Sequence, residues 1–125
     1  MAKTKWPKLP RYLIPLFHCA NVYLCLSREE WHLATDALGC PRSDIKTLAG
    51  ATRTYCNTET RENLYLLGVF NGDMATLAHE CAHIAFYVCR DTGVAIREDG
   101  ANETYCYLVG ELFKFAAGYL KKPAG

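Results

Sequence analysis

The stretch DMATLAHECAHIAFYVCRDTG, residues 73–93, predicts a long amphipathic helix. Asp73 is a favourable N-cap residue, because its side chain can accept a hydrogen bond from a free backbone N–H of the first turn. The helix is expected to end near Asp91 or Gly93. Between these ends, apolar residues recur at helical spacing, at Met74, Leu77, Ala78, Cys81, Ala85 and Val88.

Inside this helix, residues 79–83 read His-Glu-Cys-Ala-His, which is the pattern H-E-x-x-H. Residues four apart lie on one face of a helix, so the imidazoles of His79 and His83 can bind one metal ion. Glu80 would then lie beside the water on that ion, where it can act as a general base. The pattern predicts a zinc site with His79 and His83 as ligands and Glu80 as catalytic base. The competing interpretation is a pair of surface histidines without a ligand.

A catalytic zinc ion normally has three protein ligands and one open position for water. No histidine follows His83 in the chain, so a third histidine from downstream is excluded and a carboxylate is expected instead. Glu103 is the preferred candidate, because it lies in the first turn of the predicted last helix, twenty residues beyond His83. Glu98 and Asp99 are the alternatives.

Two segments near the N-terminus predict a strand and a helix. Residues 22–26 are β-branched, aromatic or aliphatic, which is typical of a strand. Ser27 is followed three residues later by Glu30, a capping box that predicts the start of a helix. Gly39 and Pro41 should end that helix.

The segment before the histidine helix predicts a hairpin, and the segment after it predicts a further helix. Residues 51–57 and 63–70 resemble strands, and the polar residues 58–62 separate them. Asn102 is expected to start the last helix, whose apolar face includes Tyr105 and Leu108. Helix, hairpin, histidine helix and last helix together predict one α+β domain over residues 12–125.

Composition limits the possible partners and the cellular location. The chain has 125 residues and a formal net charge of +1, which argues against a general binder of polyanions. Residues 1–11 alternate lysine, proline and small residues, so we expect a basic, mobile arm, for which binding to nucleic acid is the least favoured function. The apolar stretch at residues 12–26 is too short and interrupted for a membrane span and has no clear cleavage site, so we expect no membrane contact.

The cysteines favour a reducing compartment. Their number is odd and no Cys-x-x-Cys pair occurs, so a disulfide framework would leave one thiol over. We interpret them mostly as small buried hydrophobic residues of a cytoplasmic protein. They are Cys19, Cys25, Cys40, Cys56, Cys81, Cys89 and Cys106.

Three segments together resemble a known family. The hairpin, the segment Thr76-Leu-Ala-His-Glu-Cys-Ala-His83 and the segment Asn102-Glu-Thr-Tyr-Cys-Tyr-Leu-Val-Gly110 resemble small zincin-like proteins of bacteriophages and prophages, which look like minimal gluzincins. The resemblance covers about residues 51–120 and implies a zinc metallopeptidase with a zincin-like fold, acting in the cytoplasm of a bacterial host. It implies that His79, His83 and Glu103 hold the zinc. Larger gluzincins often have an aspartate four residues after the ligand glutamate, whereas this chain has Tyr107 there, so the partner of the zinc histidines is not identified.

The expected reaction is hydrolysis of a peptide bond by a zinc-activated water, with Glu80 as the base. Tyr107 or Tyr105 could donate a hydrogen bond to the oxyanion. We expect the substrate, a peptide or protein, to add as a strand to the hairpin, with residues 63–70 as the edge strand. The alternative is a phage protein without catalytic activity, which binds a host factor and keeps zinc as a structural clamp.

Overall fold

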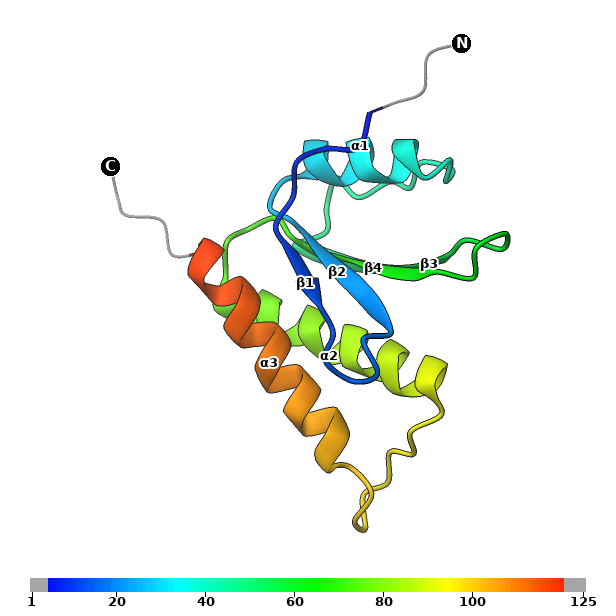
Figure 1. Ribbon diagram of the computed structural model, residues 1–125. Coiled ribbons are helices and arrows are strands. Elements are labelled where there is room, and N and C mark those ends of the chain that lie inside the picture. The colour runs from blue at the N-terminus through cyan, green and yellow to red at the C-terminus, as the bar shows by residue number, and fades with distance from the viewer. Residues whose placement is uncertain (1–4, 121–125) are drawn as a thin grey trace.

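A four-stranded sheet and three helices form the protein in the computed structural model, which describes residues 5–120. The strands lie in the order β1-β2-β4-β3, and this combination confirms the predicted α+β class (Figure 1). In chain order the elements are β1 (Arg11–Leu13), β2 (Ala20–Cys25), α1 (Arg28–Ala37), β3 (Gly50–Cys56), β4 (Asn63–Val69), α2 (Met74–Thr92) and α3 (Glu103–Leu120).

Helices pack on both faces of the sheet. Figure 1 shows α2 and α3 on one face, whereas α1 covers only one end of the other face. The larger core lies under α2 and α3, where Leu24 and Leu67 of the sheet pack against Leu77 and Leu112 of the helices. The smaller core lies under α1 and contains Trp31. The sheet face on the α1 side is therefore only partly covered.

The predicted hairpin is confirmed, but its edge strand was wrongly assigned. Strands β3 and β4 pair antiparallel, whereas β2 and β4 pair parallel, so β4 lies inside the sheet and β3 is its edge. Residues 63–70 are therefore not the edge strand. The physical reason lies in the sequence of β4, because Tyr65, Leu66 and Leu67 are each 0% exposed and a strand buried on both faces is a central strand.

The local signals for helix ends are confirmed. The Ser27 hydroxyl accepts a hydrogen bond from the Glu30 N–H at 3.1 Å, and the Glu30 carboxylate accepts one from the Leu26 N–H at 2.8 Å. The Asp73 carboxylate caps α2 by accepting a bond from the Ala75 N–H at 2.8 Å. Gly93 follows α2 with a positive φ of 73°, the left-handed conformation that ends many helices.

The N-terminal segment makes more contacts than the mobile arm that we expected. Residues 1–4 lie outside the described residues. Beyond them, the Trp6 ring packs edge-on against the Tyr23 ring at 5.0 Å, and the Pro10 carbonyl accepts a hydrogen bond from the Leu24 N–H at 3.0 Å. Within residues 5–120, no helix is both long and apolar enough to cross a membrane.

Candidate active site

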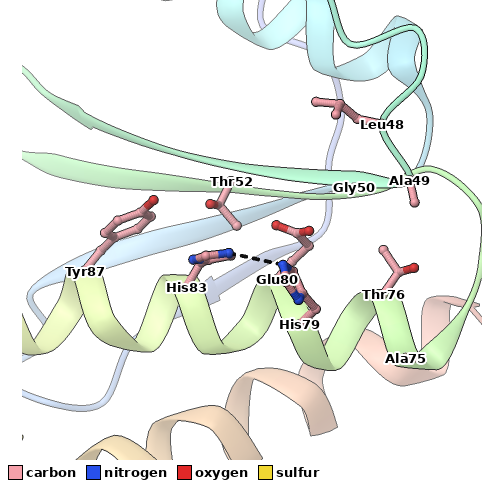
Figure 2. Close-up of a pocket in the computed structure, with 10 residues that line it drawn as sticks. All are labelled: Leu48, Ala49, Gly50, Thr52, Ala75, Thr76, His79, Glu80, His83 and Tyr87. Atoms are coloured by element: carbon pink, nitrogen blue, oxygen red, sulfur yellow. Dashed lines mark hydrogen bonds between the residues drawn. The ribbon is translucent and has the colours of Figure 1, made fainter.

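Helix α2 directs His79, Glu80 and His83 into one open pocket beneath β3 (Figure 2). The Nε2 atoms of His79 and His83 are 3.3 Å apart, which is within hydrogen-bond distance, as the dashed line in Figure 2 marks. Two nitrogens that each lie about 2.05 Å from a tetrahedral zinc ion are themselves about 3.3 Å apart. The spacing of the two imidazoles therefore fits two adjacent ligand positions of zinc.

The Glu80 side chain lies between α2 and the edge strand. Only 8% of Glu80 is exposed, whereas both histidines are exposed. Figure 2 shows its carboxylate beside the imidazoles and directed toward β3. Burial raises the pKa of the Glu80 carboxyl above its ordinary value of 4.5, and the charges of His79 and His83 oppose this shift only in part. A carboxylate with a raised pKa is a better proton acceptor, which suits a general base.

Gly50 allows the edge strand to approach α2 closely at this point. A Cβ atom on Gly50 would lie 2.7 Å from the Gly68 carbonyl oxygen, 2.8 Å from Cγ2 of Thr76 and 2.9 Å from Cγ of Glu80. No larger residue fits there unless the strand or the helix moves. The position of Glu80 relative to β3 therefore depends on a glycine thirty residues earlier in the chain.

The pocket has a volume of about 590 Å³ and contains further polar side chains that the sequence analysis missed. Tyr87 lies one turn after His83, and the two rings stack with centroids 6.5 Å apart. The guanidinium of Arg90 lies over the Tyr87 ring, 5.1 Å from the ring centre. Thr52 of β3 faces the same pocket (Figure 2). The spacing of four residues after His83 could have identified Tyr87, but no local pattern points to Thr52.

Glu103 and Tyr107 do not lie in this pocket. Both line a separate groove, which has mostly apolar walls that include Pro15 and Leu16 of the β1–β2 loop. Tyr105 packs against Phe86 of α2 with ring centroids 4.7 Å apart. Because residues two apart in a helix point in nearly opposite directions, Glu103 faces away from α2 when Tyr105 faces it. The structure therefore does not bring the predicted third ligand, or the predicted oxyanion donor, to the histidine pair.

The other candidate ligands are also placed elsewhere. Asp99 forms an exposed ion pair with Arg97 at 3.5 Å, and neighbouring Glu98 is exposed. Over residues 5–120, no group of three His, Cys, Asp or Glu side chains is arranged to hold a metal ion. Residues 1–4 and 121–125 contain none of these four residue types. The chain, as described, thus provides two of the ligands that a catalytic zinc ion needs.

The expectation that most of the cysteines are buried is wrong, because only three of the seven are buried and two more are partly exposed, Cys19 and Cys40. Cys25, Cys81 and Cys89 are buried, whereas Cys56 and Cys106 are exposed. Burial raises the pKa of the Cys81 thiol to about 12, so this thiol stays protonated near neutral pH even though it stands between the two histidines in sequence.

Comparisons of the chain with family models, with curated proteins and with solved structures give no match. The geometry of the pocket therefore stands alone as the basis for a functional proposal.

Proposed function

We propose that the protein is a zinc-dependent hydrolase of peptide bonds, with His79 and His83 as metal ligands and Glu80 as the general base. The observation that supports this most directly is the Nε2–Nε2 distance of 3.3 Å between two exposed imidazoles, beside a buried carboxylate. A structural zinc site normally has four protein ligands, whereas an open catalytic site has fewer. The role of Glu103 as the third zinc ligand stays a prediction from the sequence.

The proposed mechanism assigns a proton transfer to Glu80. A bound zinc ion would supply Lewis acidity, which lowers the pKa of a coordinated water and polarises the scissile carbonyl. The Glu80 carboxylate accepts a proton from the attacking water and later donates it to the leaving amide nitrogen. Its burial under β3 excludes bulk water and holds it on the same side of α2 as the imidazoles.

The edge strand and two side chains would position the substrate. One side of the β3 backbone has no strand partner among the described residues, and β3 forms one wall of the pocket. An extended peptide can pair with such an edge through main-chain hydrogen bonds. The hydroxyl of Tyr87 takes the role that the sequence analysis gave to Tyr107, because Tyr87 lines the pocket and can donate to a developing oxyanion.

One observation favours the alternative, a binding module without catalytic activity. The described residues offer two histidine ligands and place Glu103 in another groove. In that alternative the pocket would bind an extended segment of a host protein and hydrolyse nothing.

Substitution of the metal by cobalt tests whether the site is open. We expect Co²⁺ to bind to the metal-free protein and its visible absorption to shift when acetohydroxamate is added, because a hydroxamate displaces water from an open position. The His79→Ala variant should show neither change. A cobalt spectrum that does not respond to hydroxamate would indicate a closed site and would contradict the catalytic proposal.

The Glu80→Gln variant tests the base. We expect it to bind one zinc ion per chain with unchanged affinity and to cleave a mixed peptide library about 10²–10⁴ times more slowly than the wild type. Product peptides can be counted by mass spectrometry. If the wild type and the variant cleave at the same rate, Glu80 is not the base. If neither cleaves any peptide and both bind zinc, the binding module becomes the better explanation.

A further inference from the structure

We propose that the sheet face on the α1 side binds single-stranded nucleic acid through a track of basic and aromatic side chains. This proposal goes beyond hydrolysis, because the track lies on the sheet face opposite α2 and its histidines (Figure 1). The track begins in the N-terminal segment and crosses β1 and β2 toward β3. We call it the basic track, and its residues are Lys5, Trp6, Lys8, Arg11, Tyr23 and Tyr55.

The strand register brings basic and aromatic side chains from distant parts of the chain onto this one face of the sheet. Arg11 is opposite Tyr23, and Tyr23 is opposite Leu66, which belongs to the core under α1. Arg53 of β3 is opposite Leu66 on its other side. Residues opposite each other in neighbouring strands point to the same face. Arg11, Tyr23 and Arg53 therefore share one row with Leu66 of β4, which is fully buried and separates Tyr23 from Arg53.

A second row runs parallel to the first and ends in Tyr55. Asn21 and Tyr55 are both opposite Leu64, which also belongs to the core under α1. The C-terminal end of α1 borders this end of the sheet, because residues 37–39 line the same hollow as Tyr55 and Leu64. The two rows together present guanidinium groups, two tyrosine rings and an amide on a partly open surface.

Two hollows on this face meet at Tyr23. The first has a volume of about 850 Å³, and its lining contains three cations, Lys5, Lys8 and Arg11, and no acidic residue. The second has a volume of about 450 Å³, and beside the end of α1 and Leu64 its lining contains Tyr23, Tyr55, three asparagines and one carboxylate, Glu62. None of the ion pairs among residues 5–120 involves the three cations of the first hollow. The positive charge is therefore available to a ligand.

The chemistry of these hollows matches a single strand better than a duplex or an acidic peptide. Cations can neutralise phosphates, and the partly exposed rings of the basic track can stack on unpaired bases, which a duplex keeps covered. Asparagine side chains both donate and accept hydrogen bonds, as base edges do. An acidic peptide would pair with the cations but has no nucleobases to stack on the aromatic rings. The small net charge of the whole chain is compatible with this, because the lining of the first hollow contains three cations and no acidic residue.

Fluorescence anisotropy with a labelled oligothymidine of about 20 nucleotides tests the proposal. We expect binding by the full chain that weakens as salt rises from about 50 to 200 mM, because each phosphate contact releases counterions. The double variant Lys8→Ala/Arg11→Ala should bind at least tenfold more weakly, and its slope of log affinity against log salt should be smaller by about 1.4. The matched control is Lys114→Ala, an exposed lysine of α3, which should bind like the wild type.

The aromatic part of the track needs its own variants. Tyr55→Ala should weaken binding about tenfold, whereas Tyr55→Phe should bind nearly as well as the wild type, because stacking needs the ring and not the hydroxyl. His79→Ala should bind oligothymidine normally, so that failure of this proposal can be distinguished from failure of the proposed zinc site. The proposal is wrong if the wild type does not bind at about 50 mM salt, if Lys114→Ala is as weak as the double variant, or if polyglutamate competes as well as unlabelled oligothymidine.

Discussion

The histidine pocket and the Glu103 groove both contain a glutamate of a long helix, but the two glutamates have different surroundings. Glu80 is 8% exposed, stands beside two imidazoles and has a raised pKa. Glu103 is exposed, and the walls of its groove are mostly apolar. The difference shows that position in a helix does not by itself create a catalytic carboxylate. Burial under an edge strand raises the pKa of Glu80, and this is the property that the proposed base needs.

The two sites also differ in what fixes their geometry. The proposed ligands and the proposed base all belong to α2, so the spacing of His79, Glu80 and His83 determines how they point. Glu103 would have to meet this group from another helix, and its direction depends on how α3 is rotated. The rotation of α3 follows from its buried face, which contains Leu108, Leu112 and Ala116. The contact between Tyr105 and Phe86 fits this rotation, in which Glu103 is turned away from α2.

Substitutions in the histidine pocket and in the Glu103 groove should differ most strongly in their effect on zinc affinity. We expect His79→Ala to weaken zinc binding by more than about 100-fold, because it removes one of two ligands rather than a supporting hydrogen bond. Glu103→Ala should change the affinity by less than about threefold, as expected for a surface substitution away from the site. Competition with a zinc-binding dye measures both.

A loss of more than about tenfold in Glu103→Ala would contradict this expectation. It would mean that the first turn of α3 rotates when the metal binds, and it would restore Glu103 as the third ligand predicted from the sequence. Glu29→Ala serves as the matched control, because Glu29 is also an exposed carboxylate in the first turn of a helix, α1, and was not a candidate ligand.

Two glycines allow the same two regions to be compared by their packing. Gly50 lies beside Glu80, and Gly110 lies in α3, the helix of Glu103. Gly50→Ala should destabilise the protein by about 1–3 kcal/mol, because the new methyl group would overlap with the Gly68 carbonyl and with Glu80. Gly110→Ala in α3 should stabilise it by about 0.5–1 kcal/mol, because nothing lies within 4 Å of the added atom and alanine favours a helix. Denaturant unfolding measures both. Equal effects of the two substitutions would show that β3 is not held tightly against α2.

Local sequence patterns predicted the elements well, for reasons that the structure makes plain. Ser27 and Asp73 cap helices through hydrogen bonds to residues two or three positions away, so the signal and its effect lie in the same short segment. The spacing of His79 and His83 is equally local. The α+β class follows from the sum of such segments.

Relations between segments were harder to predict. The edge strand was wrongly assigned because the order of strands depends on the parallel pairing of β2 with β4, which is not encoded in the hairpin itself. The unbroken apolar run of β4 was the available signal. Nothing near Gly50 or Thr52 in sequence indicates that they face Glu80, since only the folded sheet brings them there. Rotation of α3 was unpredictable for the same reason.

The smallest expected effect is the change in the free energy of unfolding when Glu80 or Glu103 is replaced by glutamine. The two changes should have opposite signs. In the folded, metal-free protein the pKa of Glu80 is raised, so folding favours its protonated form. Above the ordinary pKa of 4.5 the unfolded chain loses this proton more readily than the folded one, so the raised pKa lowers the free energy of unfolding at neutral pH. We therefore expect Glu80→Gln to be more stable than the wild type at pH 7 in the presence of a chelator. This advantage should disappear as the pH falls through the raised pKa toward the ordinary value of 4.5, because both proteins are then uncharged at this position.

Glu103→Gln is the matched control, because it removes the same charge from the first turn of α3. An ionised carboxylate there interacts favourably with the helix dipole, so its loss should destabilise the protein by about 0.3–1 kcal/mol at neutral pH. Thermal unfolding of both variants across the pH range measures the two signs. If Glu80→Gln is destabilised at pH 7 like Glu103→Gln, the Glu80 carboxylate is stabilised in the folded state rather than strained by burial, and its proposed strength as a base loses its physical cause.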